Sequence, residues 1–280
     1  MSSPARRTWD RLKAHPLAVP SLCFLAVLLL LVVVGPWLSP YGYAATDLKL
    51  GGHAPDGRHW LGTDLLGRDL LARLLYGGRV SFEVAFCATT VSLAIGVVYG
   101  AVAGSLGGWV DSVLMRIVDI LYALPFTVFV ILLMVFFGRN FVLLFVAIGA
   151  VSWLTMARIV RGQVQAIRHL DFVAASQALG ASRLRILFRH LIPNALGPII
   201  AYTTLMIPGI MMFEGFLSFI GLGVQPPMSS WGSLLNDGVK EIEEYPWLMI
   251  FPSLLFSGTL LAFNFLGDAL RDALDPKGVK

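Results

Sequence analysis

The run from Pro16 to Leu38 constrains the fold more than any other stretch of the chain. Leu, Val and Ala dominate it, and it contains no charged residue. A helix of this length, rising ~1.5 Å per residue, crosses a hydrocarbon core of ~30 Å. A cleaved secretory signal is the alternative, because the preceding residues are basic, but its apolar core usually has only ~7–15 residues. The run therefore predicts a retained first membrane span.

Apolar residues also dominate the rest of the chain. Hydrophobic residues make up 57% of the sequence and charged residues 14%, whereas about 25% of residues in soluble domains are charged. Five further stretches are long and apolar enough to span: residues 80–105, 112–137, 141–163, 194–222 and 247–267. Together with the first run they predict an all-α polytopic membrane protein with about six transmembrane helices.

The long polar loop at residues 39–79 is rich in Gly, Pro and Asp. In its second half, residues 63–76, Leu and charged side chains recur at helical spacing. This pattern predicts an amphipathic helix that lies on the membrane or against the bundle. We accordingly divide the chain into residues 1–79 (N-terminal segment, first span and loop) and residues 80–280 (core transmembrane domain).

Gly96, Gly100 and Gly104 recur every four residues in the second span. Small residues at this spacing let two helices approach closely. The pattern therefore predicts helix packing.

The distribution of Lys and Arg predicts the orientation of the chain in the membrane. If the N-terminus is cytoplasmic, 14 of the 21 basic residues fall on that side, in residues 1–16, 105–116, 158–190 and from 271 onward. The positive-inside rule thus predicts that both termini are cytoplasmic. The net charge of +4 is spread over several loops, which does not suggest a nucleic-acid-binding face.

The polar stretch from Asp171 to Pro193 interrupts two apolar blocks. It carries a helical pattern, a glycine at Gly180, a proline stop and three arginines. Two short helices joined at Gly180 would form a slim, rigid knob that could enter a groove on a partner protein, oriented by charge pairs. The alternative is a solvated basic loop held by anionic lipid head groups.

Glu214 lies deep in the fifth predicted span, between Phe213 and Gly215. A carboxylate there costs ~2.5–3.5 kcal/mol unless it is paired or hydrated. It is therefore either a pore-lining residue on the translocation path or a structural hydrogen-bonding group. The pore-lining interpretation predicts that Glu214→Leu impairs transport while assembly survives.

Three further motifs carry a resemblance to a known family. They read HWLGTDLLGRDLLARLLYGGRVSF (59–82), LSFIGLGVQPPMSSWGSLL (217–235) and AFNFLGDALRDALDPK (262–277). With residues 171–193 they closely resemble the inner-membrane permease subunits of bacterial ABC importers for peptides. The resemblance is to the second permease of the oligopeptide, dipeptide and nickel group, and the phrase at residues 213–232 is most similar to the oligopeptide branch.

The resemblance implies a type I importer permease fold with a cytoplasmic coupling helix in a loop at about residues 165–190. It also implies inward transport of oligopeptides, a homologous second permease, two ATP-binding subunits and a periplasmic or lipid-anchored peptide-binding protein. ATP and magnesium would belong to the ATP-binding subunits, so this chain would hold no cofactor, no metal and no catalytic residue. Dipeptides, nickel chelates, glutathione or peptide antibiotics remain alternative cargoes.

The family's cytoplasmic signature, E-A-A-x3-G-x9-I-x-L-P, is only partly kept. Ala174 stands in place of its leading glutamate and His190 in place of its isoleucine, while Gly180 and Pro193 match. We therefore expect docking to depend on shape and on the arginines. The residues expected to couple to the ATPase are Asp171, Ala174, Ala175, Ser176, Ala178, Gly180, Arg183 and Arg185.

Other function classes lack their motifs in this sequence. It contains no G-x-x-x-x-G-K-[ST] nucleotide loop and no G-x-S-x-G or H-E-x-x-H pattern. Its five histidines are scattered without metal-site spacing. A self-contained channel or ion-driven carrier is the remaining rival, and it predicts flux from this chain alone in liposomes.

Overall fold

The computed structural model describes residues 4–138 and 140–274, so residues 275–277 of the last motif lie outside the described residues. Within the described ranges the regular elements are helices, and Thr63 and Asp69 form one isolated β-bridge. The helices are α1 (Pro4–Ala14), α2 (Ala18–Leu38), α3 (Leu70–Leu106), α4 (Gly108–Tyr122), α5 (Phe126–Phe136), α6 (Phe141–Arg168), α7 (Asp171–Ala178), α8 (Arg183–Ile186), a π-helical turn (Leu187–Leu191), α9 (Ile192–Phe219), α10 (Trp231–Lys240) and α11 (Trp247–Leu274).

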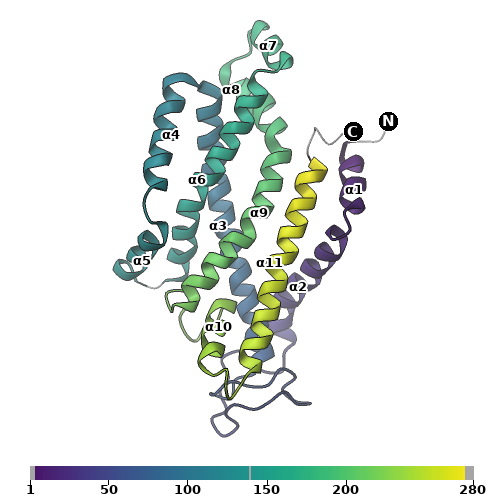
Figure 1. Cartoon of the computed structure of the whole chain (residues 1–280), viewed down its shortest axis with the longest axis vertical. Coiled ribbons are helices and arrows are strands. Elements are labelled where there is room, and N and C mark those ends of the chain that lie inside the picture. The colour runs from purple at the N-terminus through teal and green to yellow at the C-terminus, as the bar shows by residue number, and fades with distance from the viewer. Residues whose placement is uncertain (1–3, 139, 275–280) are drawn as a thin grey trace.

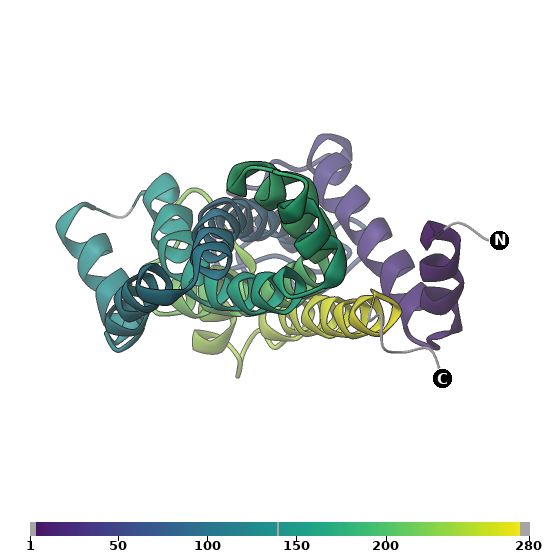
Figure 2. The same ribbon diagram turned by 90° about the horizontal axis from the view of Figure 1, so that it is seen from above.

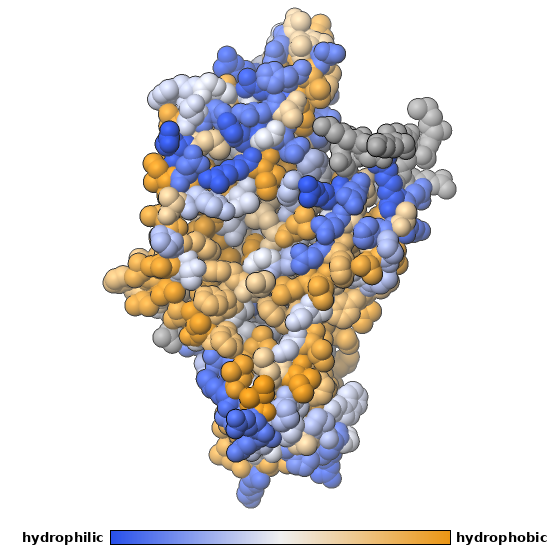
Figure 3. Space-filling view, in the orientation of Figure 1, coloured by the Kyte–Doolittle hydropathy of each residue, from blue (hydrophilic) through white to orange (hydrophobic). Residues whose placement is uncertain are grey.

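Long helices run side by side along the long axis of the molecule (Figure 1). In the described chain five are long and apolar enough to cross a membrane, and the bent pair α4–α5 makes six if it counts as one span. On the face seen in Figure 3, apolar residues form a band across the middle, and polar residues gather toward the two ends. The prediction of an all-α, multi-span membrane protein is confirmed.

The third predicted span, residues 112–137, is not one continuous helix. It is broken between Tyr122 and Phe126, and α4 and α5 meet at an angle of 73°. Pro125 explains the break, because proline disfavours the helical conformation of the residue before it and has no N–H to donate. Seen from above, α4 and α5 lie at one edge of the molecule and α1 and α2 at the opposite edge (Figure 2).

The predicted amphipathic helix at residues 63–76 is also corrected. Residues 63–69 form a loop, and α3 begins at Leu70 and continues through the membrane span, across our boundary at residue 79. Asp64 Oδ1 accepts the backbone N–H groups of Leu66 and Arg68, which holds a turn. Asp69 then accepts the N–H of Ala72 at 2.8 Å and caps α3. Local side-chain acceptors have therefore overridden the helical periodicity.

The three glycines of α3 pack against α6, as their spacing predicted. A Cβ on Gly100 would lie 2.3 Å from the carbonyl oxygen of Ala157, and one on Gly104 would lie 2.8 Å from that of Arg161. Gly96 faces Met156 at a similarly short distance. Only glycine permits this approach, so α3 and α6 form the closely packed centre of the bundle.

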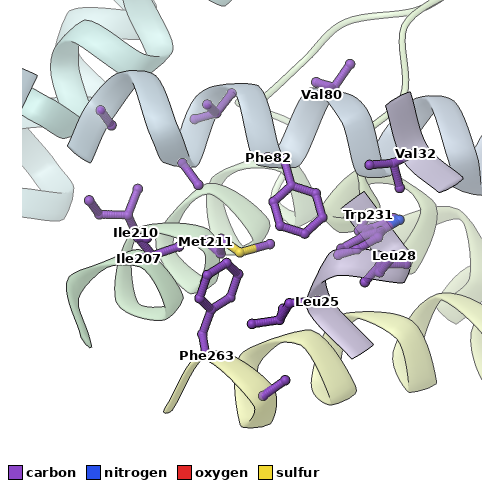
Figure 4. Close-up of a cluster of buried hydrophobic side chains, with 14 of the residues drawn as sticks. Leu25, Leu28, Val32, Val80, Phe82, Ile207, Ile210, Met211, Trp231 and Phe263 are labelled. Carbon is purple, nitrogen blue, oxygen red and sulfur yellow. The ribbon is translucent and has the colours of Figure 1, made fainter. Parts of the chain in front are cut away.

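The largest buried cluster also takes in side chains of α1, α5 and α6, and Figure 4 shows the part of it between α2, α3, α9, α10 and α11. Trp231 from α10 is fully buried there and donates Nε1–H to the carbonyl of Leu74 at 3.0 Å. Its ring meets Phe82 edge-on, with centroids 5.7 Å apart. The short helix α10 is thus fixed to the spans although it crosses no membrane.

The two ends of the bundle differ. The described ends of α1 and α11 lie at the same end as α7 and α8, and the 39–69 loop and α10 lie at the other (Figure 1). This arrangement gives the molecule one end capped by α7 and one capped by a folded loop.

Candidate functional site

The helix α7 projects beyond the spans because its sequence encodes both of its ends. Asp171 lies in the first turn, where a negative charge is favourable. At the other end Gly180 adopts φ +80°, and Ala181 N–H bonds back to the carbonyl of Ser176 at 3.1 Å. Glycine takes this conformation without steric cost. Ser182 then caps α8 by accepting the N–H of Arg185, so two short helices form a tight hairpin.

The structure brings the predicted coupling residues together on this hairpin. Asp171, Ala174, Ala175, Ala178, Gly180, Arg183 and Arg185 are exposed, and Ser176 is half-buried with its hydroxyl donating to the carbonyl of Phe172 at 2.8 Å. Within the described chain, Asp171, Arg183 and Arg185 make no ion pair inside 4 Å. Their charges are therefore available to another molecule.

The sequence analysis missed the apolar tip of the hairpin. Leu179 is 89% exposed and Leu184 is 68% exposed. They flank Gly180 on either side of the turn, where soluble proteins usually place polar residues. The leucine directly before the turn glycine was the available signal in the sequence. An exposed apolar side chain at such a tip stabilises nothing until another surface buries it.

The base of the hairpin is packed against three spans. Val173 is buried with Ile186, Leu187 and Leu191, in a cluster that also contains side chains of α3, α6 and α9. Below it, Asp111 of α4 accepts two hydrogen bonds from Arg161 of α6, at 2.5 and 2.6 Å, and one from Gln165 at 3.0 Å. The helix α7 therefore rests on side chains of α6 and α9.

Glu214 occupies a different kind of site. It is fully buried, and its carboxylate accepts hydrogen bonds from Ser81 of α3 at 3.0 Å and from Ser218 at 2.7 Å. The Ser81 hydroxyl in turn accepts the N–H of Trp231 at 3.2 Å. The expectation that Glu214 lines a translocation path stays a prediction, but in this structure the side chain faces the subunit interior. The geometry fits the structural alternative, in which the carboxylate joins α3, α9 and α10.

A second polar cluster fixes the 39–69 loop to the spans. Asp64 pairs with Arg68 at 2.7 Å and with the buried Arg73, which also reaches Asp237 of α10 at 3.4 Å. Trp247 of α11 donates Nε1–H to the carbonyl of Thr63 at 3.2 Å. The loop is thus a folded cap.

Within the cap, hydrogen bonds from backbone N–H groups order a surface turn. The N–H of His59, followed by that of Arg58, holds the pKa of the Asp56 carboxyl below its ordinary value. Among the described residues, no group of three or more His, Cys, Asp and Glu side chains could hold a metal ion.

Two family models match the chain. Residues 96–279 match the binding-protein-dependent transport system inner membrane component, and residues 3–55 match the N-terminal TM domain of oligopeptide transport permease C. The first match alone covers more than half of the chain.

Curated relatives extend over nearly the whole sequence. The oligopeptide transport system permease protein OppC of Haemophilus influenzae is 48% identical over 98% of this chain and 88% of its own length. OppC of Escherichia coli is 50% identical over 93% of this chain and 87% of that protein. The dipeptide transport system permease protein DppC of Bacillus subtilis is 46% identical over 96% of this chain and 84% of that protein.

The fold also matches a solved structure. A chain of the MetNI methionine ABC transporter, in an inward-facing conformation, superposes with a TM-score of 0.59 at 17% identity, covering 70% of this chain and 93% of that one. This likeness supports the ABC importer permease fold. The sequence matches and the shared fold together establish that the chain belongs to the family of inner-membrane components of binding-protein-dependent transport systems.

Proposed function

We propose that this chain is the permease subunit of an ATP-driven importer that moves oligopeptides inward across the bacterial inner membrane. The observation that carries the proposal is the α7–α8 hairpin, whose exposed apolar tip stands on a base shared by α6 and α9. Such a hairpin suits a groove on a motor protein, because closing of the motor would shift both spans as rigid bodies. The oligopeptide permeases among the relatives support the cargo.

The same proposal assigns the partners. A homologous second permease completes the pore, two ATP-binding subunits dock at α7, and a peptide-binding protein delivers cargo to the cap formed by the 39–69 loop and α10. ATP and magnesium are bound by the ATP-binding subunits. The α7 end and both termini then face the cytoplasm, in agreement with the positive-inside rule.

Site-specific cross-linking tests the docking. In a chain with Cys23 and Cys87 replaced by alanine, Ser176→Cys and Ala178→Cys are expected to cross-link to a co-expressed ATP-binding subunit. Ala54→Cys, which is exposed on the cap at the other end, is the matched control and is expected to give no such product. An intact complex without cross-links from α7 would place the ATPase interface elsewhere.

Dipeptides are the second candidate cargo, because a dipeptide permease is nearly as similar as the oligopeptide permeases. Uptake of labelled peptides of two to six residues by the complete transporter separates the two. We expect uptake of the longer peptides, and uptake restricted to dipeptides would overturn the oligopeptide assignment. Flux through this chain alone in liposomes would instead support a self-contained carrier.

A further inference from the structure

Two adjoining hollows open on the face where the broken span meets α6 and α9. One, of about 290 Å³, lies between α5, α6 and α9, and the other, of about 380 Å³, lies between α4, α5 and α6. Phe126, Ser152 and Thr155 line both hollows. Phe126 follows the 73° bend between α4 and α5 directly and lines both hollows.

The lining of these hollows is unusual for a surface that faces lipid. Thr155 is exposed within the span, and the Ser152 hydroxyl donates to the carbonyl of Ile148 at 2.9 Å, which leaves its lone pairs free to accept. Gly209 in α9 is exposed, with no atom within 4 Å of the Cβ position. Glycine in a helix interior costs about 0.5–1 kcal/mol relative to alanine. No packing within the chain explains that cost here, and the missing side chain leaves this part of the α9 surface open.

An aromatic pair lies at the hollow between α5, α6 and α9. Phe126 is the first residue of α5, Phe213 lies in α9, and their rings stack with centroids 4.7 Å apart at 28°. The helix α5 packs mainly on α6, and this ring contact connects it to α9. Phe213 directly precedes Glu214, whose carboxylate is fixed to α3. The Phe213 ring is therefore on a fixed part of α9, whereas the Phe126 ring is at the start of the short helix α5.

We propose that these hollows are this chain's share of the peptide path, and that the Phe126–Phe213 pair is a partition that opens for passage. The deduction rests on the proposed function. An extended peptide fits the lining, because its backbone N–H groups need acceptors such as Ser152 and Thr155, and its varied side chains can slide on aromatic faces. The lining carries no charge, which suits a path that accepts many sequences. Lipid and a tightly packed second permease are the competing occupants.

Cysteine accessibility in the complete transporter tests the path. Ser152→Cys and Thr155→Cys are placed singly in the chain lacking Cys23 and Cys87, and labelling by a charged, membrane-impermeant thiol reagent is timed. Leu261→Cys on α11, exposed but outside either hollow, is the control. We expect labelling at least tenfold faster at residues 152 and 155, and severalfold slowing by a transported peptide. Labelling as slow as at residue 261 would mean that lipid or the second permease fills the hollows, and would overturn the proposal.

Phe126→Ala and Phe213→Ala test the partition in the Ser152→Cys background. Each is expected to raise labelling from the cap side severalfold, whereas Phe136→Ala, exposed at the far end of α5, should leave it unchanged. An unchanged rate in both variants would overturn the partition.

Failure of the proposed function has a different signature. Peptide uptake by the transporter with the unaltered chain is measured first. If that transporter takes up no peptide, the cargo is wrong, and peptide will also fail to protect residue 152. Rapid labelling of residue 152 that peptide does not slow would then show a water-filled path whose ligand is not peptide. Slow labelling of residue 152 with normal peptide uptake would overturn only the location of the path.

Discussion

At the scale of single residues, the structure changes the interpretation of two positions. Leu179 was not singled out in the sequence but is 89% exposed at the α7–α8 tip. Glu214 was a candidate for the path but hydrogen-bonds inside the subunit, and its neighbour Phe213 faces the hollow instead. The two cases share a cause. The exposure of a side chain depends on which other helices surround it, and the periodicity of one segment does not contain that information.

Leu179→Asp tests the apolar tip. Covering a leucine contributes about 1.5–3 kcal/mol, and a buried unpaired carboxylate would add a desolvation cost. We therefore expect ATPase binding to weaken at least tenfold and peptide uptake to fall with it. Leu179→Met is the control and should retain both. Binding of the aspartate variant at the original affinity, measured by co-purification across a concentration series, would remove Leu179 from the interface.

Glu214→Leu tests the buried carboxylate. It leaves the hydroxyls of Ser81 and Ser218 without their acceptor, and an unsatisfied buried donor costs about 1–3 kcal/mol. We expect a lower melting temperature of the detergent-extracted subunit, and Glu214→Gln, which keeps an acceptor oxygen, should lose less. A Leu variant as stable as the original chain but defective in uptake would restore the transport role.

At the scale of elements, the sequence predicted what periodicity and length encode. The spans, the α3–α6 glycine contact and the hairpin centred on Gly180 were all expected, because each depends on residues within one segment. The break at Pro125 could have been predicted from the proline itself. The apolar run at residues 112–137 is long enough for one span, and this length favoured a continuous helix. The turn before α3 depends on local acceptors at Asp64 and Asp69 that compete with the helical periodicity. The pairing of Arg73 with Asp237 could not be predicted, because Asp237 is far along the chain.

Gly100→Ala tests the α3–α6 contact. The new methyl group would meet the backbone of Ala157 at 2.3 Å, and backbone cannot move aside as a flexible side chain can, so we expect a loss of about 1–3 kcal/mol or more. Gly162→Ala on α6 is a matched control, because no atom lies within 4 Å of its Cβ position. That control should be as stable as the original chain or slightly more stable. Equal melting temperatures for the two variants would contradict the packing.

At the scale of the whole molecule, two differently built ends enclose an apolar middle. One end presents an exposed, apolar hairpin, and the other is a cap held by buried ion pairs. This polarity suits a protein that receives cargo at one face and is driven from the other. The family and the fold are established by the comparisons, and the direction of transport is the proposal built on them.

Labelling from the two sides of the membrane tests the orientation. In the chain lacking Cys23 and Cys87, Ala54→Cys should react with an impermeant reagent in spheroplasts, and Ala178→Cys should react only in inverted vesicles. Both positions are exposed at opposite ends of the molecule, so one serves as the control for the other. The reverse pattern would place α7 outside the cell and exclude docking to a cytoplasmic ATPase.

The continuity of α3 has a mechanical consequence. Its first turns hold Arg73 in the cap, and near its far end the carbonyl of Gly104 accepts a hydrogen bond from Arg168, just before α7. Its 37 residues make a rod of about 55 Å, so a tilt of about 5° at one end moves the other by about 5 Å. A lever of this kind works in both directions. Under the proposed function, if this rod couples the two ends, a delivery protein bound at the cap changes the affinity for the ATP-binding subunit at α7. Linkage then requires that the ATP-binding subunit changes the affinity at the cap by the same factor.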